Sequence, residues 1–362
     1  MQMQSLLKSG NSKEENNMVK KIVSVVLAVT MVAGLAACGK SDGEAGKSSK
    51  AEGKYEIKVG YGTNPGHPID LGAIEFEKQV EEKGKDLGYD VDVQLFPSAQ
   101  LGSEKEMIDQ LQMGTLDMCP TTTGPLGNYD PKWLVFDLPY LFLNTKQADA
   151  VLDGDIGTEA LNWMEGQGII GLAWWENGFR ELTNNKHEIA KPEDLDGIKL
   201  RTMENDVHIE YFSSMGASPT PLGFGEIYTS LQSGVIDGQE NPISIIATNK
   251  FYEVQPYTTI SDHVYSPVPV LYSKACWDKL PEELQEVVKD AAYEVREYER
   301  KQGREQDQAY IDEVSKKSQV YILSEEEKKA FQEVAQEVYT QFEDKIGKEL
   351  MDKVIKAASE AE

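Results

Sequence analysis

Residues Leu200 to Pro242 read LRTMENDVHIEYFSSMGASPTPLGFGEIYTSLQSGVIDGQENP, and the rest of the chain can be placed around this stretch. Arg201 follows the apolar residues Ile198 and Leu200, so we expect it at the end of a strand. A guanidinium there presents a planar fork of N–H donors that matches a carboxylate. The stretch therefore predicts an arginine site for an acid, followed by a helix and a further strand.

An earlier segment of the chain repeats part of this pattern. Ser103 and Glu106 form a capping box, and Gly114 stands where a helix should end. Five identities recur at an offset of 120: Glu106, Leu111, Gln112, Gly114 and Asp117 match Glu226, Leu231, Gln232, Gly234 and Asp237. Each segment reads as a short helix closed by glycine and followed by a strand. The echo predicts two similar α/β lobes.

The second half of the chain contains the segments expected to join these lobes. Residues 263–274, HVYSPVPVLYSK, are proline-restricted and extended, which suits a crossing strand. A charged helical pattern begins at Pro281 and covers residues 281–318, which would be roughly 55 Å long at 1.5 Å per residue. One lobe is too small to need that length, so the helix should lie across both, with Gly303 as the expected point of any bend.

The N-terminal region reads as an export signal. Lys20 and Lys21 precede an apolar run over residues 22–37, and small residues lead to Cys38. The run is short for a membrane span and typical of a lipoprotein signal peptide, residues 1–38. Met18 could be the true start of the protein, in which case residues 1–17 are a mis-assigned extension. A diacylated Cys38 would anchor the protein stably. Residues 39–54 should form a flexible tether of about 22 Å.

The charged residues and the cysteines limit what the protein can bind and how its thiols are used. The 362-residue chain has a net charge of −26, which disfavours nucleic acid and anionic lipid. Only five arginines occur, and three of them cluster at residues 296–304. The two isolated ones, Arg180 and Arg201, suggest a need for bidentate geometry, although either could form a structural salt bridge. Cys119 and Cys276 are expected to be buried free thiols.

The quoted motifs resemble those of the solute-binding proteins of tripartite ATP-independent periplasmic (TRAP) transporters, the DctP-like family. The resemblance covers nearly all of the mature chain. It rests on FPSAQLGSEKEMIDQLQMGTLDM, DLPYLF, NGFRELTN, GASPTPL, EIYTSLQSGVIDGQENP and KFYEVQ. It implies an α/β fold of the periplasmic-binding-protein type, with a cleft between two lobes, crossing hinge strands and a long lobe-spanning helix.

The expected lobe limits follow from these segments. Lobe I should comprise residues 55–177 and 267–290, lobe II residues 178–266 and 319–362, and the long helix residues 281–318. The resemblance further implies an extracytoplasmic receptor that captures a C4-dicarboxylate, uronate or aldonate and passes it to a TRAP permease driven by an ion gradient.

The resemblance also assigns site residues. Arg201 matches the arginine that bridges the ligand carboxylate, and Asn241 matches the amide beside it. Phe224 and Arg180 match positions that line the pocket. An aromatic ring can cover an apolar face of the ligand, and Arg180 could either bind a second charge or hydrogen-bond hydroxyls. The alternative for Arg180 is a hinge salt bridge.

Other residues bear on which acid is bound. The loop PTTTG supplies the neutral hydroxyls of Thr121 and Thr122 where sialate-binding relatives have charged residues, so sialate is not expected. Glu204 would repel a second carboxylate and accept hydrogen bonds from hydroxyls, unless it points to solvent. These residues favour a hydroxylated monoacid and leave a dicarboxylate open.

Three further residues are weaker candidates for the site. His67 lies in a loop after the first strand, although a lone loop histidine is more often merely solvated. His263 matches a position near the ligand arginine in relatives and is an equally weak candidate. Trp174 and Trp175 should point to opposite faces of a strand, which would place one ring, that of Trp175, at the cleft. The four histidines are scattered, so neither a metal site nor a cofactor is expected.

Two other functions compete with the receptor. An exported enzyme acting on carboxylates lacks support, because no G-x-S-x-G, H-E-x-x-H or phosphate-binding glycine loop occurs. A binding lipoprotein of an ATP-driven importer would share the two-lobed architecture, and the GVIDGQENP motif argues against it. We therefore expect a monomeric, non-enzymatic receptor, lipid-anchored to the outer face of the cell membrane.

Overall fold

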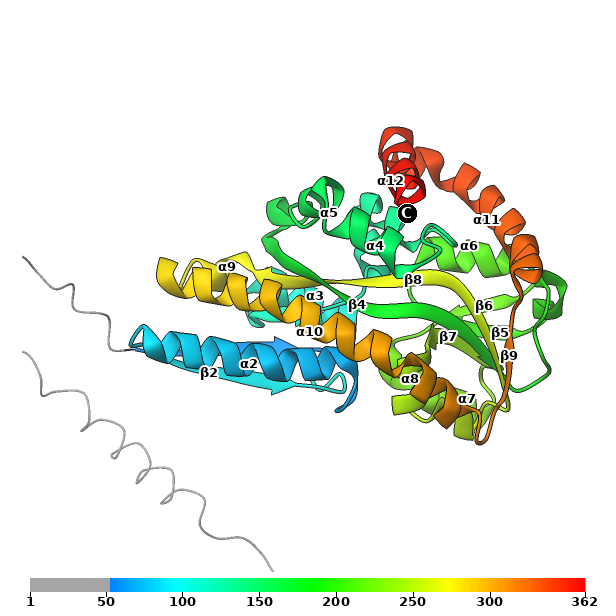
Figure 1. Ribbon diagram of the computed structural model, residues 1–362, viewed down its shortest axis with the longest axis horizontal. Coiled ribbons are helices and arrows are strands. Elements are labelled where there is room, and N and C mark those ends of the chain that lie inside the picture. Colours follow the sequence, from blue (N-terminus) through cyan, green and yellow to red (C-terminus); the bar gives the residue numbers. More distant parts are fainter. Residues whose placement is uncertain (1–52, 362) are drawn as a thin grey trace, which may run out of the picture. The chain divides into compact units, whose positions relative to one another are not determined.

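Two long antiparallel strands, β4 (Ile169–Asn184) and β8 (Tyr257–Ser273), form the centre of the fold. The computed structural model describes residues 53–361, and in Figure 1 the two strands run side by side through the middle of this part. Their register shifts at three places, one of them next to Gly178, whose φ is +102°. The strand expected to contain Trp174 and Trp175 thus continues well past both, because β8 pairs with it throughout.

The remaining strands lie on either side of this pair. They are β1 (Lys54–Gly60), β2 (Asp90–Phe96), β3 (Met118–Pro120), β5 (Lys199–Thr202), β6 (Ser218–Pro221), β7 (Gly238–Pro242) and β9 (Gln319–Ile322). The strand order is β2-β1-β3-β8-β4-β7-β5-β6, with β9 beside β8. Parallel strands therefore flank the central pair on both sides. We call the β1–β3 side lobe I and the β5–β7 side lobe II.

The helices are as follows. The α-helices are α2 (Pro68–Asp86), α3 (Glu104–Met113), α4 (Thr145–Leu152), α5 (Asp155–Ala160), α6 (Asp206–Ser214), α7 (Ile227–Ser233), α8 (Ile243–Thr248), α9 (Lys274–Trp277), α10 (Glu282–Val314), α11 (Glu325–Ile346) and α12 (Lys348–Glu360). Short 3₁₀ turns are η1 (Gly124–Asn128), η2 (Pro131–Asp137), η3 (Glu165–Gln167), η4 (Pro192–Leu195), η5 (Phe224–Glu226) and η6 (Phe251–Glu253).

The repeated sequence pattern is a repeated local structure. Helices α3 and α7 both end at a left-handed glycine, Gly114 and Gly234. The repeated aspartates make equivalent hydrogen bonds. Asp117 accepts one from the backbone N–H of Lys58, and Asp237 accepts one from the backbone N–H of Lys199. Of these two helices only α3 has a capping box, which Ser103 and Glu106 form as predicted. Glycine replaces that serine before α7, which starts instead from the 3₁₀ turn η5.

The long helix α10 packs against both lobes. It contacts α2 on the lobe I side, the central strand β4, and α8 on the lobe II side, and Figure 1 shows it crossing the sheet. It has 33 residues and ends at Val314, four short of the predicted 318. The helix continues through Gly303, where an added Cβ would lie 3.5 Å from Oε1 of Glu176, an ordinary contact. The exact lobe limits given above stay a prediction.

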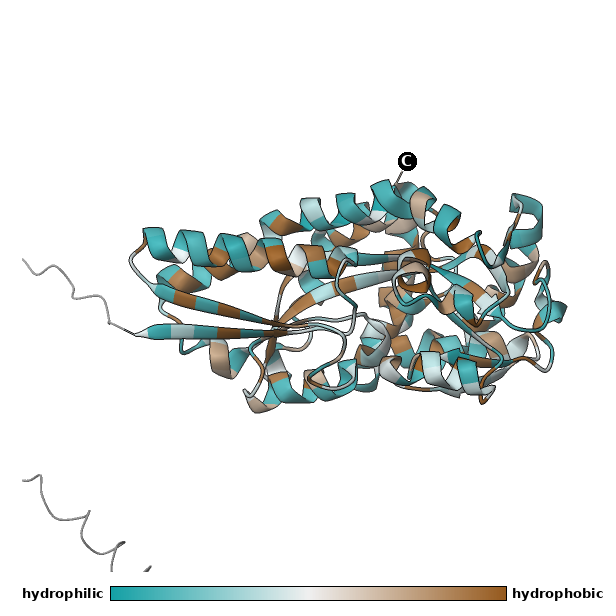
Figure 2. Cartoon of the chain, turned by 90° about the horizontal axis from the view of Figure 1, so that it is seen from below, coloured by the Kyte–Doolittle hydropathy of each residue, from teal (hydrophilic) through white to brown (hydrophobic). Residues whose placement is uncertain are grey.

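Three buried hydrophobic clusters hold these elements together. One lies between α2, α10 and the sheet, one under α7 and α8, and the largest lies under α3, α4, α6, α11 and α12. Figure 2 shows the corresponding pattern, hydrophobic on strands and inner helix faces and hydrophilic outside. Trp174 and Trp175 point to opposite faces, as predicted, but each enters a core cluster. Both faces of this central strand are covered.

Several predictions concern single residues or the termini. Cys119 and Cys276 are buried free thiols, as expected. A capping box of Ser324 and Glu327 begins α11.

Within residues 53–361 no helix is both long and apolar enough to cross a membrane, and no cluster of His, Cys, Asp and Glu suits a metal ion. The signal peptide, Cys38 and the tether up to residue 52 lie outside the described residues; Lys54, assigned to the tether, begins β1.

Candidate functional site

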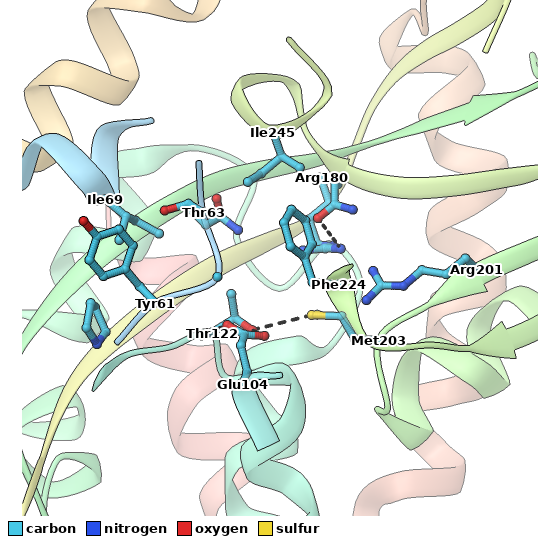
Figure 3. Close-up of a pocket in the computed structure, with 14 residues that line it drawn as sticks. Tyr61, Thr63, Ile69, Glu104, Thr122, Arg180, Arg201, Met203, Phe224 and Ile245 are labelled. Atoms are coloured by element: carbon cyan, nitrogen blue, oxygen red, sulfur yellow. Dashed lines mark hydrogen bonds between the residues drawn. The ribbon is translucent and has the colours of Figure 1, made fainter. Parts of the chain in front are cut away.

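A cavity lies between the two lobes, at the ends of the strands that flank the central pair. It encloses about 470 Å³, part of it open to solvent. Its lining comes from many elements: Tyr61, Gly62, Thr63, Ile69, Glu104, Pro120, Thr122, Asn177, Arg180, Arg201, Met203, Phe224, Asn241 and Ile245. Figure 3 shows these residues converging from both sides. Five of the ten sequence-predicted residues line it, namely Arg201, Asn241, Arg180, Phe224 and Thr122.

Arg201 emerges at the end of β5, as predicted, and its guanidinium is held in place by the backbone. Its Nε and Nη2 atoms donate to the carbonyl oxygen of Leu222 at 3.0 and 2.7 Å. The Nη1 atom is buried and has no hydrogen-bond partner among the described residues. Burial lowers the pKa of Arg201 to about 10, so the group stays charged at neutral pH. An immobilised cation with a free N–H edge suits an anion.

Arg180 lies deeper, on β4, and forms the structural salt bridge considered above. It makes a bidentate ion pair with Glu240, and its Nη2 also donates to the Glu240 carbonyl oxygen at 2.6 Å. Burial opposes ionisation of Glu240, but Arg180 and His263 outweigh it, and the pKa of Glu240 falls well below its usual range. The Nη1 atom of Arg180 is buried without a partner. Arg180 therefore combines a structural pairing with a donor at the cavity.

Asn241 follows Glu240 on β7 and is oriented by its neighbours. Its Oδ1 accepts from Nη2 of Arg180 at 3.3 Å, and its Nδ2 donates to Oε1 of Gln239 at 2.5 Å. Thr63 Oγ1 and Asn177 Oδ1 also line the cavity and lack partners among the described residues. Buried polar atoms are nearly always hydrogen-bonded in folded proteins. The cavity thus leaves two cationic donors, one hydroxyl and one amide oxygen for a ligand.

Glu104 is the acidic residue of the cavity, and sequence reasoning missed it. It is the first residue of α3, and its carboxylate accepts from the N–H of Thr122 at 2.8 Å, from Oγ1 of Thr122 at 2.9 Å and from Oγ1 of Thr121 at 3.2 Å. No ion pair with it forms within residues 53–361. Thr121 does not line the cavity and acts by holding Glu104. The available signal was an acid directly after the Ser103 cap, at the cleft end of the helix.

Glu204 does not line this cavity. Its side chain is exposed, and it borders a smaller outer cavity with Ser103 and Lys105. Its carbonyl oxygen accepts from Nδ2 of Asn128 at 2.8 Å. Met203, one residue earlier, turns inward instead. The acidic side chain that lines the cavity is therefore Glu104, from the other lobe, and not Glu204.

His67, His263 and Trp175 are buried, but none of them lines the cavity. His67 caps α2: its Nδ1 accepts from the N–H of Ile69, and its Nε2 lies 3.0 Å from Oγ of Ser244. Burial lowers the pKa of His67 to about 3, which keeps it neutral. His263 lies beside Glu240, and burial lowers its pKa. Trp175 donates from Nε1 to the carbonyl oxygen of Ala292 on α10, and so packs in the core.

The geometry defines a class of protein: a two-lobed α/β receptor whose interlobe cavity presents cationic donors to a small acid. Comparison with known proteins agrees. Residues 59–345 match the sequence profile of bacterial extracellular solute-binding proteins, family 7 (DctP). The chain belongs to this family, and the TRAP resemblance is confirmed. It is an extracytoplasmic solute receptor of the kind that works with TRAP permeases.

Three relatives illustrate the likeness. The sugar acid binding protein DctPAm of Advenella mimigardefordensis, solved with galactonate, is 37% identical and superposes with a TM-score of 0.83, over 85% of this chain and 99% of that one. A TRAP solute-binding protein of Shewanella oneidensis with bound succinate is 31% identical, with a TM-score of 0.80, over 84% and 100%. The 2,3-diketo-L-gulonate-binding periplasmic protein YiaO of Escherichia coli is 34% identical, over 86% and 90%. The two solved structures bear out the predicted two-lobed fold.

Proposed function

We propose that the ligand is a hydroxylated monocarboxylate of the sugar-acid type, captured between the lobes and delivered to a TRAP permease. The observation that carries this proposal is the pairing of Arg201 with Glu104 in one cavity. Within residues 53–361 neither Arg201 nor Glu104 forms an ion pair, whereas Arg180 is paired with Glu240. The cavity therefore offers one positive and one negative group that are both free to bond a ligand.

The two charged residues have different chemical preferences. Arg201, with Asn241 and the free Nη1 atom of Arg180, suits a carboxylate. Glu104 suits hydroxyl groups, because a carboxylate only accepts hydrogen bonds. A second carboxylate placed beside Glu104 would face a like charge. The unpartnered atoms of Thr63 and Asn177 can bond further hydroxyls.

The ligands of the relatives are of two types, with one carboxylate or with two. Galactonate and diketogulonate carry one carboxylate and several oxygen substituents, whereas succinate carries two carboxylates and no hydroxyl. Either type fits the family. The position of Glu104 favours the first type for this chain.

Replacing Glu104 with glutamine should exchange the ligand preference. The variant keeps the size of the side chain and an acceptor for Thr122 but loses the negative charge. We expect succinate to bind about tenfold more tightly or better, since like charges across an interface cost several kcal/mol. Galactonate should bind more weakly, because hydrogen bonds to charged groups are the stronger ones. Calorimetric titration of wild type and variant with galactonate, galacturonate, erythronate and succinate measures both changes.

Glu204→Gln is the matched control for this measurement. Its side chain is exposed at the rim, so the ratio of succinate to galactonate affinity should stay at the wild-type value. A shift with Glu204→Gln and none with Glu104→Gln would reverse the assignment made from the structure. Wild-type protein that binds only non-acids would end the proposal.

We also propose that the receptor is a monomeric lipoprotein without enzymatic activity. The support for the anchor is the apolar run at residues 22–37 and the small residues before Cys38. The support for a receptor over an enzyme is that burial lowers the pKa of both His67 and His263, that both make structural hydrogen bonds, and that neither lines the cavity. Cell fractionation tests the anchor: Cys38→Ala should move the protein out of the membrane fraction, and unchanged membrane association would contradict it.

A further inference from the structure

Met203 lines both the ligand cavity and the outer cavity at the rim. Both cavities are lined by Glu104, Arg201, Met203 and Phe224. The inner one continues towards Tyr61 and Asn177, and the outer one towards the exposed residues Lys105 and Glu204. Met203 is itself 5% exposed. Its side chain therefore stands at the boundary between an enclosed space and the surface of the cleft.

The thioether is fixed there by lobe I, although Met203 follows β5 of lobe II. Its Sδ atom lies 3.6 Å from Oγ1 of Thr122, a contact drawn across the site in Figure 3. The side chain also packs on Gly124, where an added Cβ would come within 2.6 Å of its terminal methyl group. A glycine at this position leaves the space that the methionine fills. The partition is thus built from both lobes.

From this arrangement we propose that Met203 sets the upper size limit of the ligand. The inference rests on the proposed function, since it concerns the acid held by Arg201. With Met203 in place, an acid bound at Arg201 can extend only into the inner cavity. Without the thioether the two spaces would join. The outer cavity offers the ammonium of Lys105 and the carboxylate of Glu204, which can hydrogen-bond a longer polyhydroxyl chain.

The test is a comparison of two aldonates that differ in length, erythronate and galactonate. We expect Met203→Ala to shift the ratio of their dissociation constants towards galactonate by about tenfold or more, since a single methylene in a pocket is worth 10- to 200-fold. Met203→Val should give a smaller shift in the same direction. Met203→Leu keeps the bulk of the side chain and should keep the wild-type ratio. Calorimetry gives the constants, and thermal unfolding shows which variants are folded.

The outcomes separate this inference from the proposed function. A ratio that stays within about twofold of wild type in both Met203→Ala and Met203→Val, while the acids still bind, overturns the role of Met203 alone. A ratio that moves equally in Met203→Leu also overturns it, because bulk would then not be the cause. Wild-type protein that binds neither acid defeats the proposed function, and the role of Met203 with it. A graded shift from valine to alanine supports the partition.

Discussion

Arg201→Ala is expected to weaken binding of the acid by about 2 to 5 kcal/mol, the usual cost of removing one partner of a buried charge pair. The carbonyl oxygen of Leu222 immobilises the guanidinium before any ligand binds. Binding to wild type therefore costs little conformational entropy at this side chain. Arg201→Lys should also bind poorly, because an ammonium cannot bond Leu222 and a carboxylate with the same planar geometry. Calorimetric titration with the acid that binds wild type best measures both losses.

Arg296→Ala is the matched control for this loss. Arg296 lies on α10, outside the cavity, where it pairs with Asp153 and Glu297 and stacks on Tyr293. Its removal deletes the same charge from the protein without touching the site, so the affinity should stay at the wild-type value. If Arg201→Lys binds the acid with wild-type affinity, Arg201 is not the residue that binds the carboxylate.

Glu240→Gln should lower the free energy of unfolding by about 3 to 5 kcal/mol, because it leaves the buried charge of Arg180 without a partner. The double variant Arg180→Met with Glu240→Leu should recover much of this loss, since apolar residues can replace a buried ion pair at little cost. Denaturant unfolding measures each variant. Glu326→Gln, which breaks an exposed pair with Lys329, is the control and should leave the unfolding midpoint unchanged.

The pH dependence gives a second readout of the same pair. The folded-state pKa of Glu240 is lowered, so its stabilisation is fully present above the ordinary carboxyl pKa of about 4.3 and is lost as pH falls towards the folded value. The stability difference between wild type and Glu240→Gln should be constant from neutral pH to about 5 and shrink below about 4. A difference that grows on acidification would show that Glu240 is protonated in the native protein.

The sequence predicted the features that depend on neighbouring residues. The capping box at Ser103, the closing glycines and the position of Arg201 at a strand end follow from local backbone chemistry. The paired aspartates Asp117 and Asp237 could be aligned by their offset alone. Their shared hydrogen bond to a strand N–H appears only in the structure, because Lys58 and Lys199 are remote in sequence.

The sequence could not predict which side chains face the ligand cavity. Glu104 and Glu204 are both acids near cavity-lining residues, and only the approach of α3 to Thr122 places the first inside. His67 suggested chemistry, but its ring caps a helix. Trp175 was placed at the cleft on strand alternation, and α10 covers that face of β4. In each case a contact between distant segments decides the role.

The unpartnered polar atoms of the cavity have a consequence for signalling between receptor and transporter. Nη1 of Arg180, Nη1 of Arg201, Thr63 and Asn177 are buried between touching lobes without hydrogen-bond partners among the described residues. Burying such a group without a partner costs free energy. An acid that bonds these groups should therefore make closure more favourable than it is for the empty receptor. A permease that docks only the closed shape would then distinguish loaded from empty receptor without touching the acid, so that empty receptors in excess would not block uptake.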